Sequence, residues 1–259
     1  MYSLLLDIVK RDVFMLKNEL IERYILFVIG LFIMAFGVAL STKATLGTSP
    51  ISCVPYVLSL GLPLTMGEFT FIMHIVFIIA QIILLRREFE LIQVLQLIVA
   101  VVFSIFTDFT MYLVSGIQVN HIIIQWLLLL LSCIILAFGI SIEVTANVLI
   151  LAGEGVILAI SRVFHKDFGR IKICFDFSLV VIGIIISFYL FHELDGIREG
   201  TIIASLLVGT IARFFIQKMQ AIDVILKNKS ILSLFLTRIQ KDSFSLNKIL
   251  RKRLHSKEQ

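Results

Sequence analysis

Residues 24–55 have the sequence YILFVIGLFIMAFGVALSTKATLGTSPISCVP, an apolar run followed by an interruption of the helical pattern. The apolar run approaches the length of about 20 residues that a membrane-spanning helix needs. Gly47, Pro50 and Pro55 then follow within nine residues, and glycine and proline are the residues that most disturb a regular helix. The stretch therefore predicts a membrane helix, a break in the backbone, and a short second segment.

The rest of the chain shares this apolar character. Of its 259 residues, 59% are hydrophobic and 16% are charged, and the mean hydropathy is +1.04. A soluble domain has about 25% charged residues, so the composition predicts an integral membrane protein. Cys53, Cys133 and Cys174 lie in apolar stretches without metal-ligand or disulfide spacing. We therefore expect neither a metal nor a cofactor.

Six segments are long enough to cross a membrane as helices. They are residues 25–42, 68–85, 91–114, 122–142, 171–191 and 200–217. Two shorter apolar segments, 49–61 and 148–162, would be only about 20 Å long as helices, a length typical of re-entrant or interfacial pieces. The predicted fold class is all-α: a polytopic transmembrane helix bundle of about six spans plus two short half-helices.

Basic residues in the loops and at the ends predict the orientation, because Lys and Arg favour the cytoplasmic side. An amphipathic N-terminal arm (1–24) and the Arg86–Arg87 pair are basic, whereas the loop at 115–121 has no Lys or Arg. The tail at 218–259 has ten Lys and Arg against three acidic residues. We expect a plasma-membrane protein with both termini cytoplasmic. The tail would contact anionic lipid, not nucleic acid, or alternatively dock a cytoplasmic partner.

A shift of 102 residues aligns the chain with itself. MAFGVALSTKATLG, from residue 34, lies over LAFGISIEVTANVL, from residue 136, and the two short segments coincide. Each copy holds three spans, an odd number, so the second copy would enter the membrane inverted, as in many secondary transporters. The predicted organisation is an N-terminal arm (1–24), membrane repeat 1 (25–114), membrane repeat 2 (122–217) and a basic cytoplasmic tail (218–259).

The pattern FGVAL…KATLGTSP resembles the YitT/YczE-like family of bacterial multi-pass membrane proteins, most of them uncharacterised. Family members are similar to it in an early G-x-A-x…A-x-LG-x-x-P signature, and the resemblance covers about residues 24–217. It implies a multi-pass fold and a membrane location, but no substrate. The second copy departs from the pattern, since it lacks counterparts of Gly47 and Pro50 and carries Gly153 and Gly155 instead.

The interruption after the first span has a functional interpretation. Thr48 or Ser49 suits a helix N-cap and Pro50 suits the first turn, so a half-helix would aim free N–H groups at its neighbour. Non-helical backbone at membrane depth must face protein or a water-filled cavity, and a plain extracellular turn before an interfacial helix is the alternative. The candidate substrate-binding residues are Leu46, Gly47, Thr48, Ser49, Pro50, Gly153, Glu154 and Gly155.

Ionisable residues within the apolar segments are candidates for coupling, because a charge in lipid is costly. Glu154, between two glycines, would hold a cation, a proton or a polar group, or would be an exposed acid at an interfacial helix start. His74 and Asp176 occupy matching positions and would move or share a proton, or make two separate polar contacts. Lys43 and Glu143, at the ends of matching helices, are expected to extend to the headgroups.

Two classes of function fit these observations. The sequence has no H-E-x-x-H, G-x-S-x-G or phosphate-binding loop motif, so we do not expect an enzyme. The first class is a secondary transporter or permease for a small solute. The second is a non-transporting membrane scaffold or regulator whose basic tail binds partners.

Overall fold

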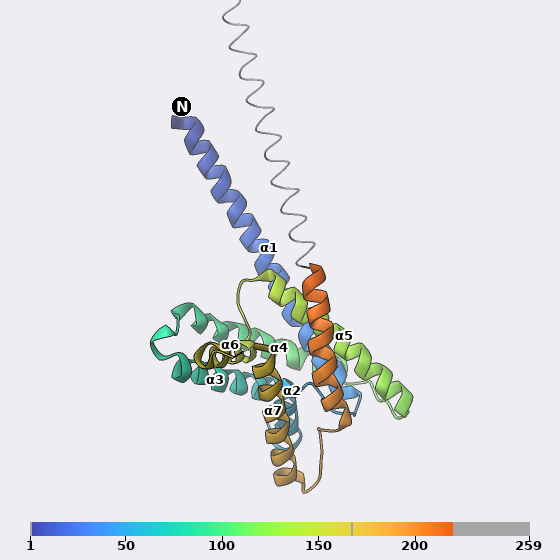
Figure 1. The fold of residues 1–259 in the computed structure, drawn as a ribbon. Coiled ribbons are helices and arrows are strands. Elements are labelled where there is room, and N and C mark those ends of the chain that lie inside the picture. Colours follow the sequence, from blue (N-terminus) through green and yellow to red (C-terminus); the bar gives the residue numbers. More distant parts are fainter. Residues whose placement is uncertain (1, 167, 220–259) are drawn as a thin grey trace, which may run out of the picture. The chain divides into compact units, whose positions relative to one another are not determined.

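The computed structural model describes residues 2–166 and 168–219, and in these residues all regular structure is helical. Predictions for the rest of the basic tail, including its contact with lipid or a partner, lie outside the described residues. The helices are α1 (Tyr2–Lys43), α2 (Pro50–Gly61), α3 (Met66–Leu85), the short 3-10 helices η1 (Arg86–Glu88) and η2 (Leu91–Leu95), α4 (Gln96–Leu113), α5 (Ile122–Ala146), α6 (Ala152–Phe164), α7 (Phe168–Phe191) and a last helix Glu199–Met219 (Figure 1).

Six helices are long and apolar enough to cross a membrane, as the sequence predicts. Their spanning parts are Leu20–Lys43, Met66–Glu88, Gln93–Leu113, Ile122–Ala146, Arg170–Phe191 and Glu199–Met219. Many large apolar side chains on these helices face outward, as expected for contact with lipid. The chain is a multi-pass membrane protein. Its N-terminal arm continues into the first span as one helix, α1, without a break at residue 24.

The first and fifth helices cross at very short range because glycines lie at the crossing. A Cβ atom built on Gly37 would lie 2.7 Å from the backbone nitrogen of Leu136, and one built on Gly139 would lie 2.7 Å from that of Met34. Gly30 also faces Gly139 across the crossing. Small residues let membrane helices approach backbone to backbone, so this crossing holds α1 and α5 together.

Each short helix packs against a long helix from the other half of the chain: α2 packs on α7, and α6 packs on α3. The starts of these elements are regularly spaced. Pro50 and Ala152 begin α2 and α6, and Met66 and Phe168 begin α3 and α7, so both pairs are 102 residues apart. Each short helix therefore contacts the long helix that follows the other short helix.

Both short helices follow breaks with left-handed backbone. Before α2, Gly47 has a φ of 104° and Thr45 a φ of 57°; before α6, Asn147 has a φ of 49°. Ser49 occupies the predicted N-cap position, but within the described structure its side chain makes no capping hydrogen bond, because it bonds the Ser52 hydroxyl instead. Residues 148–151 are non-helical, so the second short helix begins later than the predicted residue 148.

Candidate functional site

The turn at residues 46–50 is packed inside the protein. Its five residues are buried, and the Thr48 N–H donates to Thr201 Oγ1 at 3.2 Å. A Cβ atom on Gly47 would collide with the same Thr201 hydroxyl, so the left-handed glycine allows the turn to sit against the last helix. The turn lines neither of the two cavities described below. Substrate binding by Leu46, Gly47, Thr48, Ser49 and Pro50 stays a prediction.

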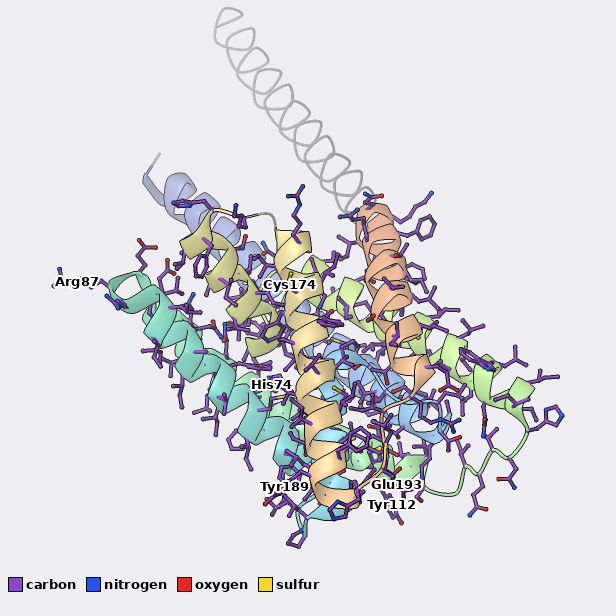
Figure 2. All side chains as sticks on the ribbon, turned by 60° about the horizontal axis from the view of Figure 1, so that its bottom comes forward. His74, Arg87, Tyr112, Cys174, Tyr189 and Glu193 are labelled. Atoms are coloured by element: carbon purple, nitrogen blue, oxygen red, sulfur yellow. The ribbon has the colours of Figure 1, made fainter. Side chains whose placement is uncertain are left out.

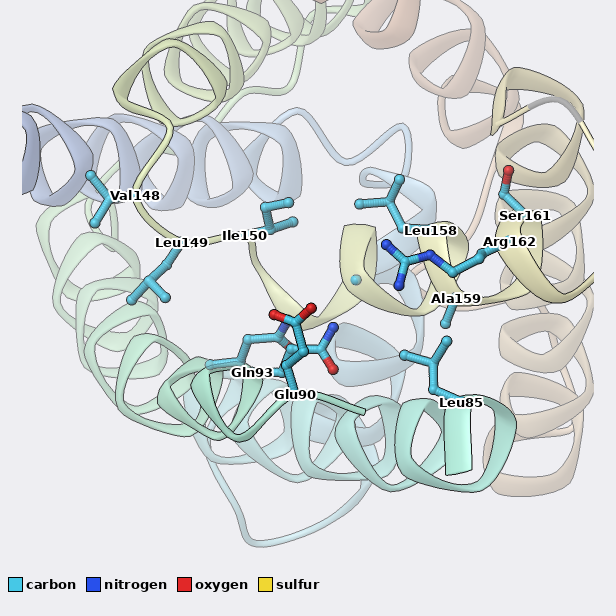
Figure 3. Close-up of a pocket in the computed structure, with 12 residues that line it drawn as sticks. Leu85, Glu90, Gln93, Val148, Leu149, Ile150, Leu158, Ala159, Ser161 and Arg162 are labelled. Atoms are coloured by element: carbon cyan, nitrogen blue, oxygen red, sulfur yellow. The ribbon is translucent and has the colours of Figure 1, made fainter. Parts of the chain in front are cut away.

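A first cavity of about 380 Å³, the α6 recess, opens between the start of α4, residues 148–150 and α6. Figure 3 shows Glu90 and Gln93 reaching into it from the segment before α4, with Arg162 of α6 on the other side. Its polar lining also includes Gln96 and Ser161, and Gly155 contributes backbone. Of the predicted substrate-binding residues, Gly155 is the one that lines this recess.

A second cavity of similar volume, about 380 Å³, is the α2 recess. It is lined by the end of α1, by Tyr56 and Leu60 of α2, by Met111 near the end of α4, and by residues 117–120. The α6 recess includes Gln96, the first residue of α4, whereas the α2 recess includes Met111, near the last. The two recesses therefore lie at opposite ends of α4, each beside the break that precedes a short helix.

Glu143, in the last turn of α5, does not extend to the headgroups as the sequence suggested. Its side chain is only 2% exposed, and Oε1 accepts a hydrogen bond of 3.0 Å from the Leu151 N–H, just before α6. Its second oxygen, Oε2, is enclosed and has no hydrogen-bond partner among the described residues. The left-handed Asn147 turns the chain back, which brings the start of α6 to this carboxyl group.

Glu154 lies in the first turn of α6 and is half-buried, with its Oε2 enclosed and unpartnered within the described part of the chain. Its charge interacts with those of Glu143 and Lys172. Burial raises the pKa of the Glu154 carboxyl above its usual range, and the nearby Lys172 ammonium offsets part of that rise. On one side of it, Gly153 packs directly on Ile51, so the first turns of α6 and α2 touch.

Two buried glutamines, which were not among the residues predicted from the sequence, hold the start of α6. Gln81 Nε2 of α3 donates to Gln96 Oε1 at 2.9 Å and to the Ala152 carbonyl at 3.2 Å. Gln81 Oε1 is enclosed without a partner in the residues described. A Cβ atom on Gly155 would lie 2.7 Å from Gln81 Oε1, so this glycine lets α6 approach the amide pair. An amide in the apolar run IAQIILL is the signal that could have identified it.

His74 and Asp176 occupy separate environments. His74 is 2% exposed, lies between the rings of Phe77 and Phe103, and Figure 2 shows it midway between Arg87 and the opposite end of the bundle. Asp176 instead pairs with Lys172, with Nζ 3.3 Å from Oδ2. In residues 2–166 and 168–219 no hydrogen bond or ion pair joins His74 to Asp176. A proton relay between them stays a prediction.

The described residues contain no group of three or more His, Cys, Asp or Glu side chains placed to hold a metal ion. Comparison with known families matches residues 21–217 to a model described as a family of unknown function, DUF6198. No curated protein and no solved structure matches the chain. The matched segment contains both recesses and the buried glutamates, and the resemblance to YitT/YczE-like proteins stays a prediction.

Proposed function

The chain belongs to the DUF6198 family of unknown function, and we propose that it is a secondary transporter that moves a small solute by alternating access. One observation carries the proposal: two recesses lie at opposite ends of α4, each beside a break before a short helix. Secondary transporters bind their substrates between such discontinuous helices, near the middle of the membrane. A solute would pass between the two recesses.

The spacing of the helices supports two inverted repeats within this transporter. The short helices and the long helices that follow them begin 102 residues apart, and each short helix packs on the other half of the chain. The contact between Ile51 and Gly153 joins positions that are also 102 residues apart. A contact between equivalent positions is expected near a two-fold axis, so we place the pseudo-symmetry axis beside the first turns of α2 and α6.

The distribution of basic residues supports an assignment of each recess to one side of the membrane. Arg86 and Arg87 follow α3 near the α6 recess, which Arg162 itself lines. By the preference of Lys and Arg for the cytoplasmic side, the α6 recess opens to the cytoplasm and the α2 recess to the outside. Cysteines introduced at Ser59, Arg87 and Ser161 test this assignment: membrane-impermeant labelling from outside should reach only Ser59→Cys.

The contacts that α6 makes with α3, α4 and α2 would block a path between the two recesses, and transport would require these contacts to open. The Gln81–Gln96 pair packs against α6 at Gly155, and the contact between Ile51 and Gly153 joins the two short helices. α6 meets its neighbours largely through side chains, whereas the α1–α5 crossing is backbone to backbone. We therefore propose that α6 and α2 move against a fixed α1–α5 pair.

The experiment measures access to both recesses at once. Ser161→Cys reports on the α6 recess and Asn120→Cys on the α2 recess. Both are made in a Cys174→Ser background, because Cys174 is exposed whereas Cys53 and Cys133 are buried. Solutes are first screened by thermal shift of the purified protein. A binding solute should change the two labelling rates in opposite directions, and Glu154→Gln should reduce its thermal shift.

Two results would contradict the proposal. If no small solute in a broad metabolite screen shifts the unfolding temperature, the recesses do not bind one. If a solute binds but both labelling rates stay constant or change together, access does not alternate. Either result would favour the non-transporting scaffold that the sequence also allows.

A further inference from the structure

The two glutamates at the start of α6 lie in an environment that does not neutralise both of them. Glu143, at the end of α5, accepts the N–H of Leu151, the N-cap of α6, and Glu154 lies in the first turn of the same helix, so both carboxyl groups are at this helix start. Each has one enclosed oxygen, Oε2, without a partner among the residues that the structure describes. An enclosed carboxylate oxygen without a donor costs free energy, and this cost favours the protonated form of the group.

We propose that Glu143 and Glu154 form a carboxyl pair that binds one proton between them, and that this proton is the coupling ion of the transport proposed above. The inference rests on the proposed function for the coupling, but the proton site itself does not. The step is a simple protonation: a proton from water in the α6 recess binds one carboxylate oxygen, forming an O–H bond, and returns to water when it leaves.

The charged groups on the neighbouring helices do not neutralise both glutamates in place of this proton. On α7, Lys172 is already paired with Asp176 at 3.3 Å, so its single charge is divided between Asp176 and Glu154. On α1, Arg23 Nη1 donates to the Ala146 carbonyl at 3.2 Å.

The uncharged and weakly basic groups of α3 and α4 do not neutralise the glutamates either. Gln81 and Gln96 are neutral amides bonded to each other, and His74 lies between two phenylalanine rings. A proton on either glutamate removes one of the two negative charges at the start of α6. Two like charges in one buried site make such sharing favourable.

The position of the pair also provides a path for the proton. Glu154 is half-buried and precedes Gly155, which lines the α6 recess, whereas Glu143 is almost fully enclosed and bonds the Leu151 N–H just before α6. Movement of α6 would change the exposure of Glu154 and break or make the bond between Leu151 and Glu143. Proton binding and the movement of α6 would therefore both act on the carboxyl groups of Glu143 and Glu154 and on the Leu151 N–H.

Infrared spectroscopy tests the proton site without any knowledge of the solute. The purified full-length protein in lipid nanodiscs is titrated with pH, and the C=O stretch of protonated carboxyl groups is recorded. The variants are Glu143→Gln and Glu154→Gln, and the matched control is Glu193→Gln, at an exposed glutamate. Glutamine keeps an acceptor oxygen for the Leu151 N–H, so Glu143→Gln preserves the fold at this point.

The expected result is a carboxyl band that persists at neutral pH in the native protein and in Glu193→Gln. Each of the two test variants should shift the titration of the remaining carboxyl to lower pH, because its like-charged neighbour is gone. Three results would overturn the proposal: a band that neither variant changes, two carboxyls that titrate independently, or loss of the band at constant pH when sodium replaces choline. A confirmed band without solute-dependent labelling would refute the transport function alone.

Discussion

Replacing Gly139 with alanine should destabilise the protein by forcing α1 and α5 apart. The new Cβ atom would lie 2.7 Å from the Met34 backbone nitrogen and 3.0 Å from the Gly30 carbonyl oxygen. Ordinary contacts of this kind are at least 3.4 Å. Both neighbours are backbone atoms of a long helix, so a change of rotamer cannot relieve the overlap.

The magnitude follows from this geometry. The two helices must separate by about 0.4–0.7 Å at the crossing, and overpacking of this kind costs about 1–3 kcal/mol. For a chain of this size, each kcal/mol lowers the unfolding temperature by about 2–4 °C. Because Glu143 lies one turn further along α5, the shift should also weaken its hydrogen bond to Leu151.

The assay is thermal unfolding of the purified protein in detergent, with Gly209→Ala as the control. Gly209 is also a helical glycine, but no described atom lies within 4 Å of a Cβ built there, so its alanine variant should be as stable as the native protein or more so. Equal unfolding temperatures for Gly139→Ala and the native protein would refute the close helix crossing and with it the fixed α1–α5 pair.

Three further predictions concern Gly47 in the first break, Glu154 in α6, and Asp108, which bonds the start of α3. Gly47→Ala should greatly reduce the folded yield, measured by size-exclusion chromatography, because φ is 104° and the new Cβ would meet the Thr201 hydroxyl; normal yield would contradict this. Burial raises the pKa of Glu154 above its ordinary 4.5. Its contribution to the free energy of unfolding should therefore be greatest below pH 4.5 and be lost as the pH rises through the higher pKa of the folded state. Glu154→Gln should flatten the dependence of unfolding temperature on pH. Asp108→Ala should cost about 1–3 kcal/mol, seen as a lower unfolding temperature, because Asp108 accepts the Gly67 N–H at 2.7 Å; Asp108→Asn, which keeps an acceptor oxygen, should cost less.

Part of the candidate site could be predicted from the sequence because it depends on local chemistry. Glu154, between two glycines in a short segment, was expected to hold a cation, a proton or a polar group, or to be an exposed acid at a helix start; the structure places it half-buried in the first turn of α6, and its role stays a prediction. Gly47 was correctly taken as the centre of a break, but its turn packs against the last helix and lines no described recess. Glu143 was expected at the headgroups, since sequence position alone cannot show that Asn147 reverses the chain and returns Leu151 to it.

The sequence by itself determined the membrane class, the six long helices and the two short ones, because span length and apolar composition are local properties of the chain. The tertiary structure decided which polar groups meet. Gln81 and Gln96 are 15 residues apart, on α3 and α4, whereas Glu143 is on α5, and all three converge on the start of α6 because α6 packs on α3 and follows a left-handed turn. A polar group in an apolar interior needs a hydrogen-bond partner, and where that partner comes from another helix only the packing of the helices supplies it.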